Sequence, residues 1–332
     1  MSDKVETLEV TPDDAGIRLD RWFRVRFPHI TNSYLQKLLR SGQVRVDSRR
    51  CEANLRLEAG SQVRVPKVIR TLGESETPER RVVHQTSPAD QKLIEDMILY
   101  EDDLVLVLNK PFGIAVQGGT GTKRHIDGLL AGMSARFGDR PRLVHRLDRD
   151  TTGVLLVAKT RGTAGKLGKV FQSRSAHKTY WAVVKGVPRP PQGKIMTPLV
   201  KAAGPDGDRV RKAEPGEQKE AMHATTHYAV IDRVTNRAAW VSLKPVTGRQ
   251  HQLRAHMAII GHPIMADNKY NLHPDEISGN VEQKLHLHAR RLQLPHPSGN
   301  GTIDVTAPLP DHMRATFELL GFNPDRYERG ED

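Results

Sequence analysis

The first candidate for chemistry is a charged run that meets an apolar segment in residues 145–160, HRLDRDTTGVLLVAKT. Asp148 lies there between Arg146 and Arg149, just before an expected strand. Burying such charges beside a strand costs free energy unless they are paired or used, so the segment is a candidate site. A surface turn with incidental ion pairs would explain the same residues, and for an isolated charge run it is the commoner outcome.

A second candidate lies in residues 245–270, where a Thr-Gly turn precedes a helix expected over residues 249–260. On that helix Arg249, Gln252 and His256 fall roughly on one face, at three- and four-residue spacing. An amphipathic helix with a polar outer face would give the same pattern. The apolar stripe of the helix would be formed by Leu253, Met257 and Ile260.

An aromatic residue, Tyr180, opens an apolar segment in the third candidate, residues 177–186. A tyrosine at the start of a strand usually packs in the core or at a sheet edge. Enzymes that act on nucleic acids, however, often stack a base on such a ring. The residues alone leave both roles open for Tyr180.

The spacing of histidines, glycines and cysteines does not indicate a metal site, a nucleotide site or a disulfide. His251, His256 and His262 are near in sequence, but there is no His-Glu-x-x-His pattern and no carboxylate between them. The glycine-rich segment 113–123 lacks the Gly-x-x-x-x-Gly-Lys-Ser/Thr spacing of a phosphate-binding loop. A single cysteine, Cys51, excludes a disulfide framework and a cysteine-rich zinc site. We therefore predict no metal and no cofactor.

The composition favours a polyanionic partner. The chain has 332 residues and a net charge of +12, which would attract phosphates, although an unspecialised basic surface gives the same total. The N-terminus has no apolar run typical of a signal peptide, and no stretch approaches the roughly 18 apolar residues of a membrane span. We expect a soluble, cytoplasmic protein that makes no membrane contact and is a monomer.

Composition divides the chain into four parts. We predict a flexible N-terminus at residues 1–15, a small basic domain at 16–66, a linker at 67–95 and a large second domain at 96–325. The small domain holds ten arginines and one lysine against four acidic residues, a net of +7. This local excess places the expected contact with a polyanion in the first domain.

Within the basic domain, the pattern predicts a helix that follows a Thr31 N-cap and ends before Gly42. An alternating strand, a turn at Asp47-Ser48 and a second strand should follow the helix. The cations on this helix and hairpin that would contact phosphates are Lys37, Arg40, Arg45, Arg49 and Arg50.

The second domain mixes strands and helices without the regular alternation of a doubly wound sheet, so we predict an α+β fold. Residues 187–222, rich in Pro, Gly, Lys and Glu, should form a long and partly flexible excursion. The expected strands cover residues 104–108, 153–158, 180–184, 226–231 and 238–243. Besides residues 249–260, the expected helices cover residues 165–172 and 311–319.

Seven short motifs, in this order, closely resemble the RluA-type pseudouridine synthase family over about residues 97–300. The motifs are Asn109-Lys110-Pro111, His145-Arg146-Leu147-Asp148, Lys178-Thr179-Tyr180, Gly248-Arg249-Gln250-His251-Gln252-Leu253-Arg254, Gly261-His262-Pro263-Ile264, Leu287-His288-Ala289 and His296-Pro297. The small basic domain resembles an S4 RNA-binding domain. The resemblance implies a catalytic domain with a mixed, mostly antiparallel sheet and a central cleft, and it implies ribosomal RNA as the partner.

The resemblance also implies roles for single residues. Asp148 would be the nucleophile, Tyr180 would pack against the target base and move a proton, and Arg254 would form an ion pair with the aspartate. Arg146 would occupy the space of the flipped nucleotide. Further substrate contacts are expected from His145, Arg249 and Leu253. The reaction breaks the N1–C1′ bond of uridine and rejoins the base through C5, and a carboxylate suits it because carboxylates capture sugar electrophiles.

Three positions depart from the family pattern. Thr151-Thr152-Gly153 stands where Thr-Ser-Gly is more frequent, which is a mild change. Ala266 stands where the family usually has glycine before an Asp-x-x-Tyr segment. Asp47-Ser48 replaces the Asn-Gly that is common in the S4-type hairpin, so we expect a different backbone conformation in that turn.

The main alternative to an enzyme is an RNA-binding ribosome-assembly factor with an inactive or dispensable catalytic domain. An inactive relative should have lost Asp148, Tyr180 or Arg254, and all three are present. A general binder of single-stranded nucleic acid would explain the charge but not the Asp148 segment. We therefore favour a pseudouridine synthase that acts on large-subunit (23S) ribosomal RNA.

Overall fold

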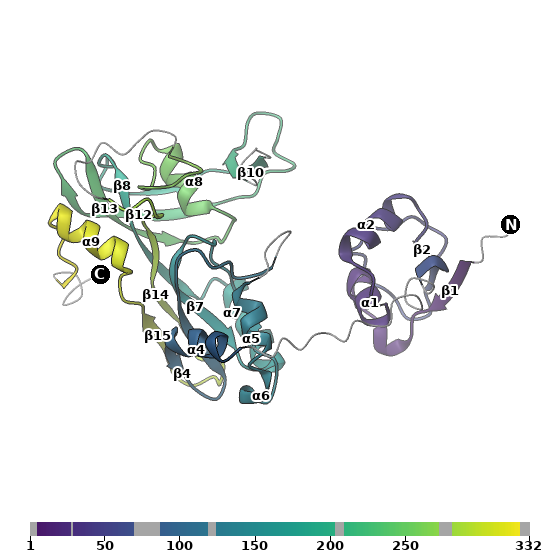
Figure 1. The fold of residues 1–332 in the computed structure, drawn as a ribbon. Coiled ribbons are helices and arrows are strands. Elements are labelled where there is room, and N and C mark those ends of the chain that lie inside the picture. The colour runs from purple at the N-terminus through teal and green to yellow at the C-terminus, as the bar shows by residue number, and fades with distance from the viewer. Residues whose placement is uncertain are drawn as a thin grey trace. The chain divides into compact units, whose positions relative to one another are not determined.

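The computed structural model separates the chain into two compact units, Met1–Val83 and His84–Asp332 (Figure 1). Each unit has a hydrophobic core of its own and is described by itself. The residues that the structure describes are 5–27, 29–69, 87–118, 124–202, 209–271 and 281–325.

The first unit packs helices against a small antiparallel sheet in the order β1-β3-β2. Its elements are β1 (Val5–Glu9), a 3-10 turn (Pro12–Asp14), α1 (Leu19–Arg26), α2 (Asn32–Arg40), β2 (Arg45–Val46) and β3 (Gln62–Pro66). Trp22 and Phe23 of α1 are fully buried in its core. The expectation of a flexible segment at residues 1–15 is wrong for the described part, because β1 pairs with β3 along its whole length and Val10 is fully buried.

The predicted helix and hairpin of the first unit are confirmed, but the turn differs from expectation. The Thr31 hydroxyl caps α2 by accepting the amide of Tyr34 at 3.2 Å. Asp47 and Ser48 have φ values of 48° and 65°, which is the type I′ geometry that Asn-Gly also adopts. The expected change of backbone conformation is therefore wrong. The Asp47 carboxylate accepts the amide of Gln62 at 2.7 Å and helps to hold this turn.

The second unit is built on a ten-stranded mixed sheet with the path β4-β5-β7-β14-β8-β13-β12-β9, while β15 pairs with β14 and β6 with β7. Only β7 and β14 run parallel among the described pairs. Its strands are β4 (Ile98–Glu101), β5 (Val105–Lys110), β6 (Arg142–Leu143), β7 (Thr152–Ala158), β8 (His177–Lys185), β9 (Gln192–Met196), β12 (Thr225–Val234), β13 (Ala238–Pro245), β14 (Leu287–Pro295) and β15 (Thr302–Thr306). The predicted α+β fold with a mixed, mostly antiparallel sheet is confirmed.

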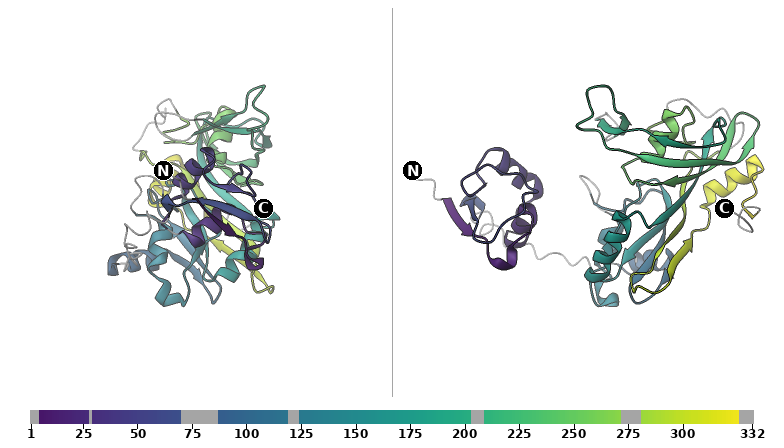
Figure 2. Two further views of the ribbon diagram at one scale, coloured as in Figure 1. Left: turned by 90° about the vertical axis from the view of Figure 1, so that its right-hand side faces the viewer. Right: turned by 180° about the vertical axis from the view of Figure 1, so that it is seen from behind.

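Helices cover both faces of this sheet (Figures 1 and 2). They are α4 (Pro88–Asp96), α5 (Ile126–Ala131), α6 (Ser134–Phe137), α7 (Arg161–Gln172), α8 (Gln252–Ile259) and α9 (Asp311–Leu320). Along β8, Ala182 and Val184 pack in one core with residues of α8, whereas Trp181 and Val183 pack in another with residues of α9. Because side chains alternate along a strand, α8 and α9 lie on opposite faces.

The close pairing of β7 with β14 depends on Gly153. Its φ is 105°, and an added Cβ would lie 2.2 Å from the carbonyl oxygen of Ala289 in β14. No other residue fits there without displacing the strand. The Thr-Thr-Gly sequence thus ends the charged loop by bringing β7 against the centre of the sheet.

Two segments are more ordered than their composition indicates. The segment 67–95 was expected to be a linker, but α4 begins at Pro88 and buries Ile94 in the core of the second unit. Residues 70–86 lie outside the described residues. The excursion at 187–222 contains the edge strand β9 and a two-stranded sheet of β10 (Leu199–Ala202) and β11 (Arg209–Lys212). Local sequence propensity does not indicate these helices and strands, because contacts with the rest of the unit order them.

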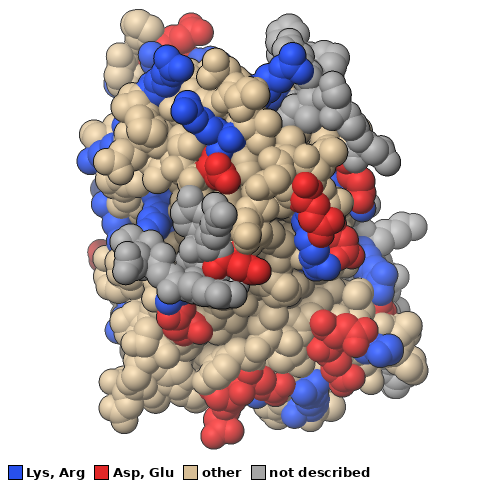
Figure 3. All heavy atoms as spheres, turned by 90° about the vertical axis from the view of Figure 1, so that its left-hand side faces the viewer, with Lys and Arg blue, Asp and Glu red and all other residues tan. Residues whose placement is uncertain are grey.

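One face of the molecule carries side chains of both charges. Figure 3 shows one face of the molecule on which basic and acidic side chains are interspersed among other residues. This face alone would not attract a polyanion strongly. Among the residues that the structure describes, no helix is long and apolar enough to cross a membrane.

Candidate active site

All seven residues predicted to act on the substrate line one pocket of about 650 Å³ in the second unit. The loop before β7, the start of β8 and the segment that leads into α8 converge there. The predicted residues in its wall are His145, Arg146, Asp148, Tyr180, Arg249, Leu253 and Arg254. Tertiary folding therefore brings the three sequence segments together.

Among the residues that the structure describes, Asp148 is the only carboxylate that lines this pocket. Its side chain is 19% exposed. One carboxylate oxygen lies 3.9 Å from Nη1 of Arg254, and the other lies 4.0 Å from Nε2 of His251. The arrangement places a partly exposed carboxylate beside the guanidinium of Arg254.

Lys110 supports the loop that carries Asp148. Its side chain is fully buried at the end of β5, and its Nζ donates to the carbonyl oxygens of Pro111, Ile114 and Arg149 at 2.8, 2.9 and 2.8 Å. Burial lowers the pKa of Lys110 to about 7. The Asn-Lys-Pro motif thus ties β5 to the backbone next to Asp148, a role that the sequence did not disclose.

Arg254 is held mainly by Asp267. The two side chains form a bidentate ion pair at 2.8 and 2.7 Å, and both are almost completely buried. Burial lowers the pKa of Arg254, but the hydrogen bonds and charge of Asp267 outweigh it and raise this pKa above its ordinary value. Arg254 is therefore a permanent cation, oriented by Asp267 toward Asp148. The sequence indicated the contact with Asp148 but not the role of Asp267.

The departure at Ala266 now has a structural reason. Ala266 has a φ of 53°, in the left-handed region where glycine is favoured. This bend lets Asp267 face Arg254 while its carboxylate also accepts the amides of Lys269 and Tyr270 at 2.9 and 3.1 Å. The preference for glycine at this position in the family follows from the backbone, and alanine adopts the same conformation with some strain.

The helix expected from Arg249 begins instead at Gln252, which is buried. Its side-chain oxygen accepts the hydroxyl of Thr247 at 2.7 Å and the amide of Arg249 at 3.1 Å. Its nitrogen donates to the carbonyl of Thr225 and the hydroxyl of Thr226, both at 2.9 Å. The alternative of a polar outer face does not hold for Gln252, because these hydrogen bonds fasten the start of α8 to the sheet.

The three histidines considered for a metal face different partners. Nδ1 of His256 lies 2.9 Å from the hydroxyl of Thr226, and burial lowers the pKa of His256 to about 4. Nδ1 of His262 bonds to the carbonyl of Lys185, while His251 contacts Tyr270. Within the described ranges, no group of three or more His, Cys, Asp or Glu side chains could hold a metal ion.

Tyr180 lies where two cores of the second unit meet, and it contacts both. Burial, followed by the nearby charge of Asp148, raises the pKa of Tyr180 above its ordinary value. The phenol is therefore neutral at physiological pH and keeps a proton to exchange. Its position in the wall allows both the stacking and the proton-transfer role that the resemblance implies.

The remaining predicted residues differ in how they are held. Nε2 of His145 accepts the amide of Leu156 at 2.8 Å, its ring stacks on Phe171, and burial lowers its pKa to about 3. This ring fastens the loop to β7. Arg146 and Arg249 are exposed at the pocket, and Nε of Arg249 donates to a backbone carbonyl at 3.1 Å.

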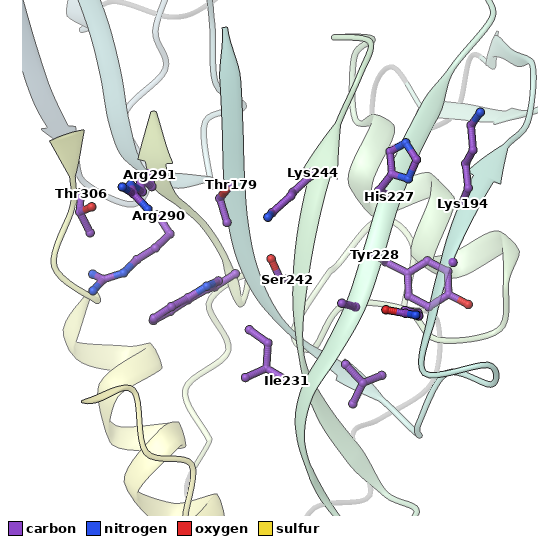
Figure 4. Close-up of a pocket in the computed structure, with 15 residues that line it drawn as sticks. Thr179, Lys194, His227, Tyr228, Ile231, Ser242, Lys244, Arg290, Arg291 and Thr306 are labelled. Atoms are coloured by element: carbon purple, nitrogen blue, oxygen red, sulfur yellow. The ribbon is translucent and has the colours of Figure 1, made fainter. Parts of the chain in front are cut away.

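A larger hollow of about 1090 Å³ lies on the other face of the sheet (Figure 4). Thr179 lines it, whereas its neighbour Tyr180 points into the first pocket. His227 and Lys194 line it from opposite positions on the paired strands β12 and β9 (Figure 4). Neither Asp148 nor Arg254 borders this hollow.

Comparison with known proteins decides the family. The model of the family described as RNA pseudouridylate synthase matches residues 104–259. The ribosomal large subunit pseudouridine synthase C of Escherichia coli strain K12 is 37% identical over 325 residues, covering 95% of this chain and 97% of that protein. The chain belongs to the RluA-type RNA pseudouridine synthases. The family predicted from the seven motifs is thereby confirmed.

Further relatives support the same family. An uncharacterized RNA pseudouridine synthase of Synechocystis sp. is 35% identical and covers 96% of this chain and 95% of that protein. The solved structure of human RNA pseudouridylate synthase domain containing 4 matches with a TM-score of 0.60 and 30% identity, over 72% of this chain and 98% of that one. As an RNA pseudouridine synthase, this protein is an isomerase.

Proposed function

We propose that this synthase isomerises specific uridines of large-subunit ribosomal RNA and that Asp148 is its nucleophile. The observation that carries the proposal is the position of Asp148, which is the only carboxylate that the described part of the chain places in the pocket with Arg254 and Tyr180. The 37% identity with a ribosomal large subunit pseudouridine synthase supports the choice of RNA.

In the proposed reaction the target uridine leaves its stack and enters the pocket. The carboxylate of Asp148 bonds to the nucleotide, the N1–C1′ bond breaks, and the base turns. When C5 bonds to C1′, the bond to Asp148 breaks and the free carboxylate is restored. The proton on C5 is lost and N1 gains one, so no electrons are exchanged with a cofactor. Tyr180 is placed to pass the proton, while Arg254 lies beside the carboxylate and orients it. The exposed Arg146 would fill the space that the flipped nucleotide leaves.

The substrate is tested with RNA that carries tritium at uridine C5, because forming the C5–C1′ bond releases that tritium to water. We expect release from large-subunit ribosomal RNA, or from its assembly intermediates, and none from transfer RNA offered separately. Tight binding of all these RNAs without release from any would favour the assembly-factor alternative. Release from transfer RNA alone would contradict the proposed substrate. A cytoplasmic monomer remains our expectation.

We also propose that the first unit is an S4-type domain that binds RNA phosphates. Its helix α2 leaves Lys37 and Arg40 exposed, and the hairpin turn leaves Arg49 and Arg50 exposed. Arg45 is half-buried and donates to the carbonyls of Gly42 and Ser48, so part of its role is to hold the turn. The helix and hairpin thus present cations suited to phosphate contacts.

Replacing Lys37 and Arg49 together with alanine should weaken binding to RNAs of every sequence. Each lost phosphate contact removes about one released counterion, so the slope of log Kd against log salt should fall by about 2. A filter-binding titration over salt concentration measures this slope.

The matched control replaces Arg18 and Arg56 with alanine, which removes the same charge from the same unit. Arg18 pairs with Asp20, and Arg56 donates to the carbonyl of Gly16. We expect the slope to stay as in the wild type. If both double variants lower the slope equally, the effect is one of net charge and the assignment of α2 and the hairpin is wrong.

A further inference from the structure

We propose that His251 is a positioning residue that presents an Nε2–H donor to Asp148, and that Tyr270 fixes the tautomer that makes this possible. The inference rests on the proposed role of Asp148 and extends it with a second donor beside Arg254. Nε2 of His251 lies 4.0 Å from one carboxylate oxygen of Asp148, and Nη1 of Arg254 lies 3.9 Å from the other. Two donors therefore face the two oxygens of one carboxylate.

The backbone aims His251 at this position. It is the residue before α8 and has a φ of 50°, in the left-handed region that side chains other than glycine rarely adopt. Such a conformation costs free energy and is often found at functional sites. It turns a side chain that is only 9% exposed into the wall of the pocket.

A chain of hydrogen bonds sets the tautomer of His251. The amide of Val210 donates to the hydroxyl oxygen of Tyr270 at 2.8 Å, and this oxygen lies 3.1 Å from Nδ1 of His251. Because the phenol oxygen already accepts the Val210 proton, its own proton is available to donate to Nδ1. Nδ1 is then the acceptor, and a neutral imidazole must carry its proton on Nε2.

The charges around the site agree with a neutral ring. Burial lowers the pKa of His251, and although the charge of Asp148 opposes this, Arg254 and Lys269 add to the lowering. The charge of Asp148 also acts on the cation of Arg254 and on the phenols of Tyr180 and Tyr270, and the pocket wall holds the further cations Arg146, Arg174, Lys178 and Arg249. Lys110 lies behind the loop. A neutral donor can orient the carboxylate without adding a second full positive charge to quench its nucleophilicity.

The distance fits a site that closes on its substrate. At 4.0 Å, His251 and Asp148 are about 1 Å too far apart for a direct hydrogen bond. Catalytic hydrogen bonds are commonly long before the substrate binds and tighten in the complex. The seated nucleotide would bring the carboxylate onto the Nε2–H group.

The hydrogen-bond chain also gives the β10–β11 hairpin a connection to the chemistry. Val210 is buried within β11, where its amide reaches Tyr270 in the loop after α8. The hairpin belongs to the segment 187–222, to which the sequence assigned no catalytic part. Its contact with Tyr270 places it two hydrogen bonds away from His251 and three contacts away from Asp148.

Two substitutions at His251 separate the donor from the rest of the side chain. His251→Asn keeps a polar atom at the level of Nδ1 for Tyr270 and tolerates the left-handed backbone, but it cannot reach Asp148. His251→Gln places an amide N–H at the level of Nε2. We expect His251→Asn to lower kcat about 10- to 100-fold with KM unchanged, since misplaced reacting groups cost rates of that order, and His251→Gln to restore most of it.

The measurement is tritium release under saturating and limiting RNA, with thermal unfolding of each variant beside it. His227→Asn is the matched control, because His227 is exposed on the far face of the sheet, and we expect wild-type kcat. Full activity of His251→Asn would overturn the inference. Equal losses in His251→Asn and His251→Gln would also overturn it, since a merely structural role predicts no rescue.

A second variant tests the link to Tyr270. If Tyr270 acts through His251, then Tyr270→Phe should lower kcat, and adding it to His251→Asn should lower kcat no further. Additive losses would overturn the proposed chain. Failure of the proposed function is distinguishable from all these outcomes, because the wild type itself would then release no tritium or Asp148→Asn would remain active.

Discussion

Asp148→Asn should abolish tritium release from uridine-labelled RNA, with kcat reduced by at least about 10³-fold. The amide has nearly the same shape as the carboxylate, so the pocket and the position of Arg254 should be kept. It has neither the charge nor the nucleophilic oxygen that the reaction needs. RNA affinity should remain at the wild-type level, because most binding energy comes from phosphate contacts elsewhere. Single-turnover kinetics and filter binding on one RNA measure both quantities.

Asp150→Asn is the matched control for this substitution. Asp150 lies in the same loop, and replacing it with asparagine changes the charge by the same amount. Its carboxylate pairs with Arg149 and is not in the wall of the pocket. We expect it to retain activity within a few-fold of the wild type. If Asp148→Asn releases tritium at the wild-type rate, Asp148 is not the nucleophile. Another group of the pocket would then have to perform that role.

Asp267→Ala should produce the largest loss of stability among single changes near the site. It leaves the guanidinium of Arg254 buried without its bidentate partner, which for buried pairs costs about 3–5 kcal/mol. It also removes the acceptor for two backbone amides. Catalysis should fall as well, because Arg254 would no longer be held toward Asp148. Chemical unfolding of the second unit and kcat of the remaining folded protein measure the two effects.

The control for Asp267 is Asp304, which pairs with Arg291 through two hydrogen bonds of 2.7 Å each. That pair has the same bidentate form, but both side chains are 38% exposed. Asp304→Ala should therefore cost no more than about 1 kcal/mol, because water screens and replaces the interaction. Equal losses in the two variants would mean that burial of the Arg254–Asp267 pair does not set its importance.

The elements that could be predicted from the sequence are those with a strong local pattern. The apolar run before Ala158 and the capped helix after Thr31 formed as expected, because period and capping are properties of neighbouring residues. The helix expected over 249–260 formed over Gln252–Ile259, but the sequence did not indicate that its polar residues are buried. Gln252 and His256 are buried, and both form a hydrogen bond with the hydroxyl of Thr226 in a distant strand.

Elements with weak patterns could not be predicted. Helix α4 in the segment 67–95 and the strands within 187–222 lack a clear apolar period, and tertiary contacts order them. The pairing of β1 with β3 likewise joins residues about sixty positions apart. Local propensity carries no information about such partners.

The sequence by itself determined which chemical groups this synthase has. The motifs around Asp148, Tyr180 and Arg254 fixed the family and the expected reaction, since a reaction needs particular groups in a particular order along the chain. Only the tertiary structure decided how those groups are held. Asp267 orients Arg254, and Tyr270 orients His251, because folding brings α8 and the loop after it against the end of β7. Hydrogen bonds and buried charges depend on distance in space, and separation in sequence does not specify that distance.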